Sequence, residues 1–315
     1  MILIVSYPGD VHAQAVARAL KTRGHEPALL DLSRFPDPVR LELRYGASGA
    51  SGMRLHDDAW GHVDLGQCRA TWWRRPQPFG TPAELTDPTF RAFAANEARE
   101  VFGGLWGLMD GAWINDPQRD DQAHRKSFQL RIAEQVGLTV PDTVITNAPD
   151  VARAFIGQYG PRGTVFKAFS GTPQAWRETR LIGEEELAQL DLVRLAPVIF
   201  QRYIEGVDIR VTVIGDRIFP AEIDIGDGDY AVDFRMNYDH LRMRPIELPT
   251  PVADGIHALM DRLGLVYGAI DFRRTPGGEY LFLEINPAGQ WLFIEHQTHQ
   301  PITEAMADAL IARDG

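Results

Sequence analysis

The chain has 315 residues, of which 44% are hydrophobic and 24% are charged, and its formal net charge is −11. This length favours two or three α/β units over a single core, and the composition is that of an ordinary globular protein. The negative charge argues against general binding to nucleic acid or to anionic membranes, because both would repel it. A ligand that carries phosphate would therefore need local cations.

A single cysteine, Cys68, excludes an internal disulfide and indicates a reducing compartment, and we interpret it as a small buried apolar side chain. The amino-terminal apolar run is too short for a signal peptide and lacks a basic flank. No stretch approaches the roughly 20 apolar residues that a membrane span requires. We therefore expect a cytoplasmic protein without a nucleic-acid or membrane partner.

The amino-terminal third of the chain predicts an α/β unit. Apolar strands at 1–5 and 27–31 flank a helix at 11–23, and this βαβ opening lacks the glycine-rich turn of a dinucleotide site. A hairpin or a long loop is expected at 41–61, and a helix at 88–109.

The stretch TWWRRPQPF at 71–79 has two interpretations. In the first, Trp72 and Trp73 pack in a core or an interface while Arg74 and Arg75 are solvated. In the second, the end of a strand presents the two guanidinium groups to an anionic substrate.

Lys167 ends an apolar strand in the middle of the chain. Because its neighbours are apolar, its ammonium must find an anion or reach water. The residues that follow, Ser170-Gly171-Thr172, form a flexible loop, so this lysine predicts a phosphate site. Around it we expect helices at 126–136 and 149–159 and strands at 143–146 and 164–167.

The segment EGVDIRVTVIGD places one acid and one base on a strand that is otherwise apolar. Asp208 suits the hydroxyls of a ribose, and Arg210 suits a carboxylate or an acyl phosphate. A cross-strand ion pair is the alternative for these residues. The acidic stretch 224–233 lacks the spacing of a calcium loop and predicts a solvated loop. Further expected elements are strands at 197–204 and 218–224 and helices at 251–264 and 302–313.

Two apolar runs, 266–272 and 280–285, predict a β-hairpin around Pro276-Gly277-Gly278. Asp271 lies on the first strand, Glu284 lies on the second, and Asn286 shares a strand face with Glu284. If the strands pair, these three oxygen ligands converge and suit Mg²⁺. The alternative is an edge hairpin whose acids point to solvent.

This hairpin, GAIDF…FLEINPAGQW, resembles the metal-binding end of the ATP-grasp ligases. The longer ending EINPAGQWLFIE, followed by PITEAMADAL, is most similar to the microviridin-type (graspetide) peptide macrocyclases, with ribosomal-protein glutamate ligase-like enzymes as further relatives. The resemblance implies an α/β fold of the α+β ATP-grasp type. It also implies a pre-ATP-grasp domain at 1–117 and two subdomains, 118–199 and 200–315, that sandwich ATP.

The resemblance also assigns roles to individual residues, with ATP and Mg²⁺ as cofactors. The loop at 168–178 would cover the nucleotide. Arg210 and Arg235 would act in catalysis by offsetting the charge of the transferred phosphoryl group. The residues expected to bind the nucleotide are Lys126, Lys167, Gln201, Arg202, Tyr203 and Asp208, with the three at 201–203 acting largely through main chain. Asp271, Glu284 and Asn286 would hold the metal. Without the resemblance, Lys126 would be interpreted as a solvated lysine at a helix start.

The implied reaction activates a peptide side-chain carboxylate as an acyl phosphate, which a hydroxyl or amine then attacks to give an ester or amide. The expected partner is a peptide, either alone or as a leader-bearing precursor, and a homodimer is left open. TWWRRPQPF would contribute to an open peptide groove if its strand end is exposed. The alternatives are a ligase for free amino acids or for tail extension, and a non-catalytic nucleotide-binding module.

Overall fold

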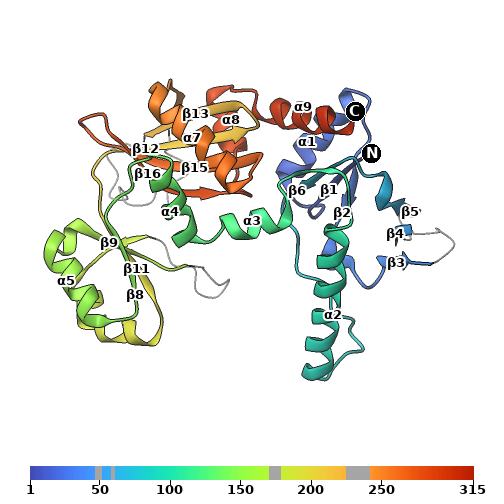
Figure 1. Ribbon diagram of the computed structural model, residues 1–315, viewed down its shortest axis with the longest axis horizontal. Helices are drawn as coiled ribbons and strands as arrows, with labels where there is room; N and C mark the ends of the chain where they lie inside the picture. The colour runs from blue at the N-terminus through green and yellow to red at the C-terminus, as the bar shows by residue number, and fades with distance from the viewer. Residues whose placement is uncertain (47–51, 58–60, 170–178, 225–241) are drawn as a thin grey trace.

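The structure is a computed structural model that describes residues 1–46, 52–57, 61–169, 179–224 and 242–315 (Figure 1). In these ranges the strands form four sheets. None of the described helices is long and apolar enough to cross a membrane. Short 3₁₀ helices lie at Leu32–Arg34, Leu65–Gln67, Pro161–Gly163 and Leu190–Leu195.

The first sheet is parallel, with strand order β2-β1-β6-β7, and contains the predicted βαβ opening. Its helix begins at Val11 because the Asp10 carboxylate accepts the backbone N–H of His12 at 3.0 Å and so caps the first turn. The bounds are β1 Ile2–Val5, α1 Val11–Thr22, β2 Ala28–Leu30, β6 Ala70–Trp73 and β7 Ala112–Ile114.

Residues 41–61, for which a hairpin or a long loop was expected, contribute to a small antiparallel sheet of β3 Arg40–Arg44, β4 Gly52–Asp57 and β5 Gly61–Asp64. Helix α2, Pro88–Trp106, follows and extends away from the sheets in Figure 1. Its buried face starts at Ala98, so only its second half packs on the rest of this region. Cys68 is buried near this core, as predicted.

The middle sheet is antiparallel, with strand order β10-β9-β11-β8, and has a small core of its own with α5. The helices α3 and α4 precede it in sequence, but α4 packs on the last sheet and its helix α7. The bounds are α3 Pro117–Ala123, α4 Lys126–Gln135, β8 Thr143–Thr146, α5 Pro149–Tyr159, β9 Thr164–Lys167, β10 Arg180–Leu181, α6 Glu184–Ala188 and β11 Val198–Arg202.

The last sheet is antiparallel, with strand order β14-β13-β12-β15-β16. Alternation along β12 gives it two faces, because Ile209 and Val211 pack under α7 and α4 while Asp208 and Arg210 lie on the opposite face. The bounds are β12 Val207–Ile214, β13 Arg217–Asp224, β14 Arg242–Pro245, α7 Thr250–Leu263, β15 Tyr267–Arg274, β16 Tyr280–Asn286, α8 Leu292–Thr298 and α9 Ile302–Asp314.

The two ends of the chain share one hydrophobic core. Ile4 and Trp72 of the first sheet belong to the same buried cluster as Trp291 and Leu310 near the carboxyl terminus. Helix α9 lies beside α1 (Figure 1), and the amino group of Met1 contacts Asp314 at 2.5 Å. The first sheet is therefore packed directly against the segment that follows the β15–β16 hairpin.

Candidate active site

The predicted hairpin forms, and its register brings the two carboxylates together. Asp271 on β15 lies directly opposite Glu284 on β16, and Asn286 lies opposite Ala269. The register shifts beyond Asp271, so that Phe272 pairs with Phe282 and Leu283 is the extra residue. This bulge turns both phenylalanines into the core and leaves both carboxylates on the other face.

Each of these carboxylates contacts a cation from another element. Asp271 Oδ1 accepts a hydrogen bond from Arg210 Nη1 at 2.6 Å, and Glu284 pairs with Lys126 at the start of α4. Burial lowers the pKa of Arg210, but the charge and hydrogen bond of Asp271, together with Tyr267 and Glu284, more than offset this, so the pKa is raised. The acids therefore do not point into bulk solvent, and Lys126 is not a solvated lysine.

The donor set fits Mg²⁺. Two carboxylates and an amide offer only oxygen ligands, which hard divalent cations prefer. Asn286 Oδ1 accepts the backbone N–H of Ala288 at 2.9 Å, and a carbonyl oxygen has a second lone pair for a ligand. No group of three His, Cys, Asp or Glu side chains gathers in the described ranges, so the remaining ligands would be water and phosphate.

Gln129 on α4 holds the edge strand that carries Glu284. Its amide donates to the carbonyl of Ile285 at 2.7 Å and accepts the Ile285 N–H at 3.1 Å, which satisfies both main-chain groups on an open sheet edge. Gln129 was not among the site residues predicted from the sequence. A signal existed, because Gln129 shares a helical face with the buried Ile132 and Ala133.

Lys167 lies at the end of β9, on the middle sheet. Its Nζ donates to Gln201 Oε1 at 2.8 Å, and Gln201 in turn donates to Thr143 Oγ1 at 2.9 Å. The side chain of Gln201 is buried, so it positions Lys167 in addition to its main-chain role in β11.

The next two residues of the predicted adenine link use their N–H groups within the protein. Arg202 N–H donates to Asp142 O and Tyr203 N–H donates to Gly163 O, both at 2.8 Å. Contacts from these two residues to a base would therefore be made by their carbonyl oxygens.

Asp208 and Arg210 each form the cross-strand ion pair that was the alternative interpretation. Asp208 lies opposite Arg273 on β15, and their side chains are 3.2 Å apart. Arg210 lies opposite Asp271. Both side chains of the Asp208–Arg273 pair are buried, and the role of Asp208 at a ribose stays a prediction.

The turn that follows Asn286 is held from the first sheet by Arg74. This guanidinium is fully buried, and its Nη1 donates to the carbonyls of Ala288 and Gly289 at 2.6 Å each. Its Nε donates to Asp10 Oδ2 at 3.1 Å. Both interpretations of Arg74 were wrong, because it is neither solvated nor open to a substrate. Trp72, stacked against it, is core.

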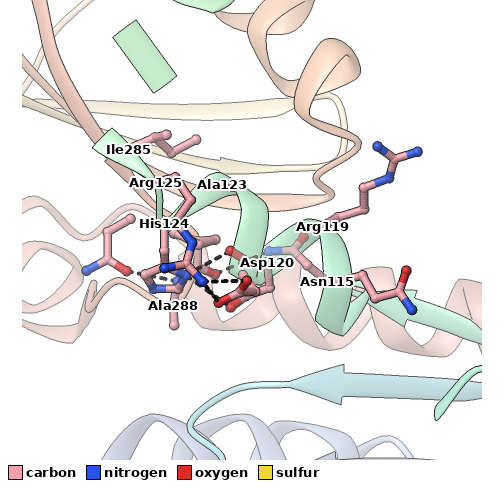
Figure 2. A network of polar contacts seen from close by, with 12 residues as sticks. Asn115, Arg119, Asp120, Ala123, His124, Arg125, Ile285 and Ala288 are labelled. Carbon is pink, nitrogen blue, oxygen red and sulfur yellow. Dashed lines mark hydrogen bonds and ion pairs between the residues drawn. The ribbon is translucent and has the colours of Figure 1, made fainter. Parts of the chain in front are cut away.

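Asn115, which directly follows β7 of the first sheet, also holds the same turn. Asn115 donates to the carbonyls of Tyr267 and Pro287 and accepts the N–H groups of Val266 and Tyr267. Figure 2 shows Asn115 on the segment that leads into α3. It also shows His124 at the end of α3, whose Nδ1 forms a hydrogen bond of 2.8 Å with the Asp120 carbonyl.

Gly289 is required by close packing in this turn. A Cβ on Gly289 would come within 2.4 Å of the Ala269 Cβ and 3.6 Å of Arg210 Nη2. The turn therefore lies between Arg74 on one side and Arg210 on the other.

Comparison with known proteins shows the family to which the chain belongs. A family model described as "MvdD pre-ATP grasp domain" matches residues 1–121. The macrocyclase MdnC from Microcystis aeruginosa MRC, bound with precursor peptide MdnA, is 30% identical over 99% of both chains, with a TM-score of 0.88. The chain belongs to the ATP-grasp ligases related to MdnC.

Two other solved relatives contain a bound nucleotide. A RiPP-associated ATP-grasp ligase from Chryseobacterium gregarium, in complex with ADP and a leader and core peptide, is 28% identical over 100% of this chain and 98% of that chain, with a TM-score of 0.89. The ligase PsnB, complexed with minimal precursor, Mg and ADP, is 27% identical over 100% and 97%, with a TM-score of 0.81. A search of curated proteins found no match.

The α/β fold of the α+β ATP-grasp type with an amino-terminal pre-ATP-grasp part is thereby confirmed, and this ATP-grasp ligase is an ADP-forming enzyme. The predicted division at residues 117 and 199 stays a prediction. Arg235, residues 170–178 of the expected covering loop and residues 225–233 of the acidic stretch lie outside the described residues. The roles of the remaining site residues stay predictions. The structure adds the distances between these residues.

Proposed function

We propose that this ATP-grasp ligase transfers the γ-phosphoryl group of ATP to a peptide side-chain carboxylate, giving an acyl phosphate and ADP. A hydroxyl or amine of the same peptide then attacks the acyl carbon and expels phosphate, and the attacking group loses its proton. The product is a peptide closed by an ester or amide. The observation that carries the proposal is the Asp271–Glu284 pair on one sheet face, with Arg210 paired to Asp271 and Lys126 paired to Glu284.

The residues of this chain position charge and do not form covalent bonds. Asp271, Glu284 and Asn286 would hold Mg²⁺, which neutralises phosphate charge when it is bound. Arg210, anchored by Asp271, presents its guanidinium beside the carboxylates, where a carboxylate or phosphate would bind. Lys167 and Lys126 supply ammonium groups for the nucleotide, and Arg235 would complete the site.

The peptide substrate is proposed from the relatives. MdnC was solved with a precursor peptide, and the Chryseobacterium ligase with a leader and a core peptide. We extend this substrate class, including a leader-bearing precursor, to the present enzyme because the matches span nearly the full length of both chains.

The test is peptide-dependent ADP release combined with mass spectrometry. The assay offers single amino acids, acidic peptides and the peptide encoded beside the gene. Loss of the mass of one water per linkage from an intact peptide is expected. Mass gained in steps of one amino acid would show a tail-extending ligase, and ADP release with free amino acids alone would show an amino-acid ligase. Absence of ADP release with every substrate would contradict the proposal.

A further inference from the structure

A groove lies in the pre-ATP-grasp region, between α2 and the segment 73–79 that follows β6. Its volume is about 760 Å³, and its walls include Trp73, Phe79 and Trp106. These three rings are half-buried, so each keeps part of its surface on the groove. The fully buried Phe102 packs against Phe79 and Trp106, with ring centroids 5.0 and 5.3 Å apart. The walls are therefore supported by the core beneath them.

Both walls of the groove lie close in the chain to residues that contact the candidate active site. On one wall, Pro76 lies two residues after Arg74, which holds the turn at Ala288 and Gly289. On the other wall, Asp121 of α3 lies five residues before Lys126, which contacts Glu284. Five residues of chain span at most about 18 Å. An extended peptide would cover that distance in about five residues or fewer.

The charges around the groove determine what it would take. Asp116 caps α3 by accepting the N–H groups of Gln118 and Arg119, and Asp121 is bound by Arg125 at 2.8 Å. The negative charges of Asp116 and Asp121 are thus stabilised by partners within the protein. What remains on the groove is aromatic and proline surface together with the guanidinium of Arg99, which donates to Asn96. The apolar part of this surface suits apolar side chains on an extended chain.

We propose that this groove binds the part of the peptide substrate next to its reacting carboxylate, through apolar or aromatic side chains. This proposal rests on the proposed function, because the occupant is the peptide whose carboxylate is activated. It corrects the predicted use of TWWRRPQPF, since Trp73 and the prolines line the surface while Trp72 and Arg74 are buried.

Two neighbouring glycines of α2 give a matched pair of variants. Gly103 lines the groove and Gly104 does not, and a Cβ on either would meet nothing within 4 Å. Successive helical positions point about 100° apart, so Gly103→Phe fills the groove while Gly104→Phe points elsewhere. Both changes replace a helical glycine with the same residue, so their effects on helix stability should match.

The experiment measures KM for the peptide encoded beside the gene, at full length and cut to about two residues on each side of its acidic residues. Gly103→Phe should raise KM of the full-length peptide by about ten-fold or more, and Gly104→Phe by less than about two-fold. With the shortened peptide, the wild-type enzyme should show a KM near that of Gly103→Phe with the full-length peptide. For Gly103→Phe itself, shortening the peptide should raise KM only slightly further. Thermal melting and binding of an ATP analogue should be equal in the two variants.

Equal KM values for the two variants, in a wild-type enzyme that does close the peptide, would overturn the groove and leave the proposed function standing. If the wild-type enzyme releases no ADP with peptide, the proposed function falls and the groove assignment falls with it. If sedimentation shows a dimer that Gly103→Phe dissociates, the groove holds a second copy of the chain and the peptide proposal is wrong.

Discussion

Two arginine–aspartate pairs approach the turn after Asn286 from opposite sides. Arg74–Asp10 belongs to the first sheet and its neighbouring turn, and Arg210–Asp271 belongs to the last sheet. In the first pair both side chains are almost completely buried, at 0% and 2% exposed, whereas Asp271 in the second keeps 16% of its side-chain surface exposed. The chemistry is the same, and the surroundings differ.

The surroundings decide what each pair can do. Asp10 also accepts hydrogen bonds from Ser6 and from the His12 N–H, and Arg74 donates to two carbonyls, so that network is closed around protein atoms. Asp271 lies beside a second carboxylate, Glu284, at the edge of the sheet. An ion pair that is surrounded by protein atoms, such as Arg74–Asp10, can only stabilise the fold. An ion pair whose carboxylate lies beside a second carboxylate, such as Arg210–Asp271, can also attract a bound cation.

The largest expected effect separates the two pairs by stability. Arg74→Met leaves Asp10 buried without its cation and should lower the free energy of unfolding by about 3–5 kcal/mol. Arg210→Met should cost less, because Asp271 is partly exposed. Added Mg²⁺ should raise the melting temperature of Arg210→Met by more than that of Arg74→Met, because only the first variant removes the cation that occupies Asp271. Equal rescue of both variants would contradict the distinction drawn between the pairs.

The second prediction concerns activity at the open pair. Glu284→Gln keeps size but removes a metal-binding charge, so peptide-dependent ADP formation should fall by about 100- to 1000-fold while the melting temperature holds or rises. Glu279→Gln, an exposed change in the same hairpin, is the control and should leave both values unaltered. Turnover of Glu284→Gln at saturating Mg²⁺ would show that the hairpin is not the metal site.

The third prediction concerns Lys167 at the end of β9, whose Nζ donates to Gln201 Oε1. If its ammonium serves phosphate, Lys167→Ala should weaken binding of a Mg–ATP analogue by about ten-fold or more, measured by calorimetry, because a charge-assisted bond contributes about 1.5–3 kcal/mol. Lys21→Ala, at an exposed ion pair on α1, is the control. Unchanged affinity in a folded Lys167→Ala would remove Lys167 from the nucleotide site.

The smallest expected effect is the pH dependence of the closed network. His12 Nε2 accepts the N–H groups of Trp291 and Leu292, so the ring must be neutral there, and burial lowers its pKa from 6.5. As pH falls below 6.5, His12 therefore takes up a proton in the unfolded chain before it does so in the folded protein, and the free energy of unfolding decreases. Between pH 7.5 and 5.5 the loss should reach about 1.4 kcal/mol at most.

Denaturant unfolding of wild type and His12→Gln at the two pH values checks this. The glutamine carbonyl can accept a hydrogen bond and does not titrate, so the variant should lose less stability on acidification. An equal loss in both proteins would assign the acid sensitivity to other groups.

Much of the fold and part of the site could be predicted from local pattern. The βαβ opening, the strand that ends at Lys167 and the β15–β16 hairpin all follow from alternation and turn residues. The partners of the charged residues could not be predicted, and this is where Arg74 was misinterpreted. Lys126 and Glu284 are 158 positions apart, and Arg74 and Gly289 are 215 apart.

The sequence by itself determined the βαβ opening, the β15–β16 hairpin and the strand face that carries Asp271, Glu284 and Asn286, because a period of two and a glycine-containing turn are local properties. Only the tertiary structure decided that Arg74 clamps the turn after Asn286, that Gln129 closes the edge of β16, and that Trp73 lines a groove while Trp72 is core. The reason is physical. Whether a charged or aromatic side chain is solvated, paired or buried depends on the element that packs against it, and that element comes from a distant part of the chain.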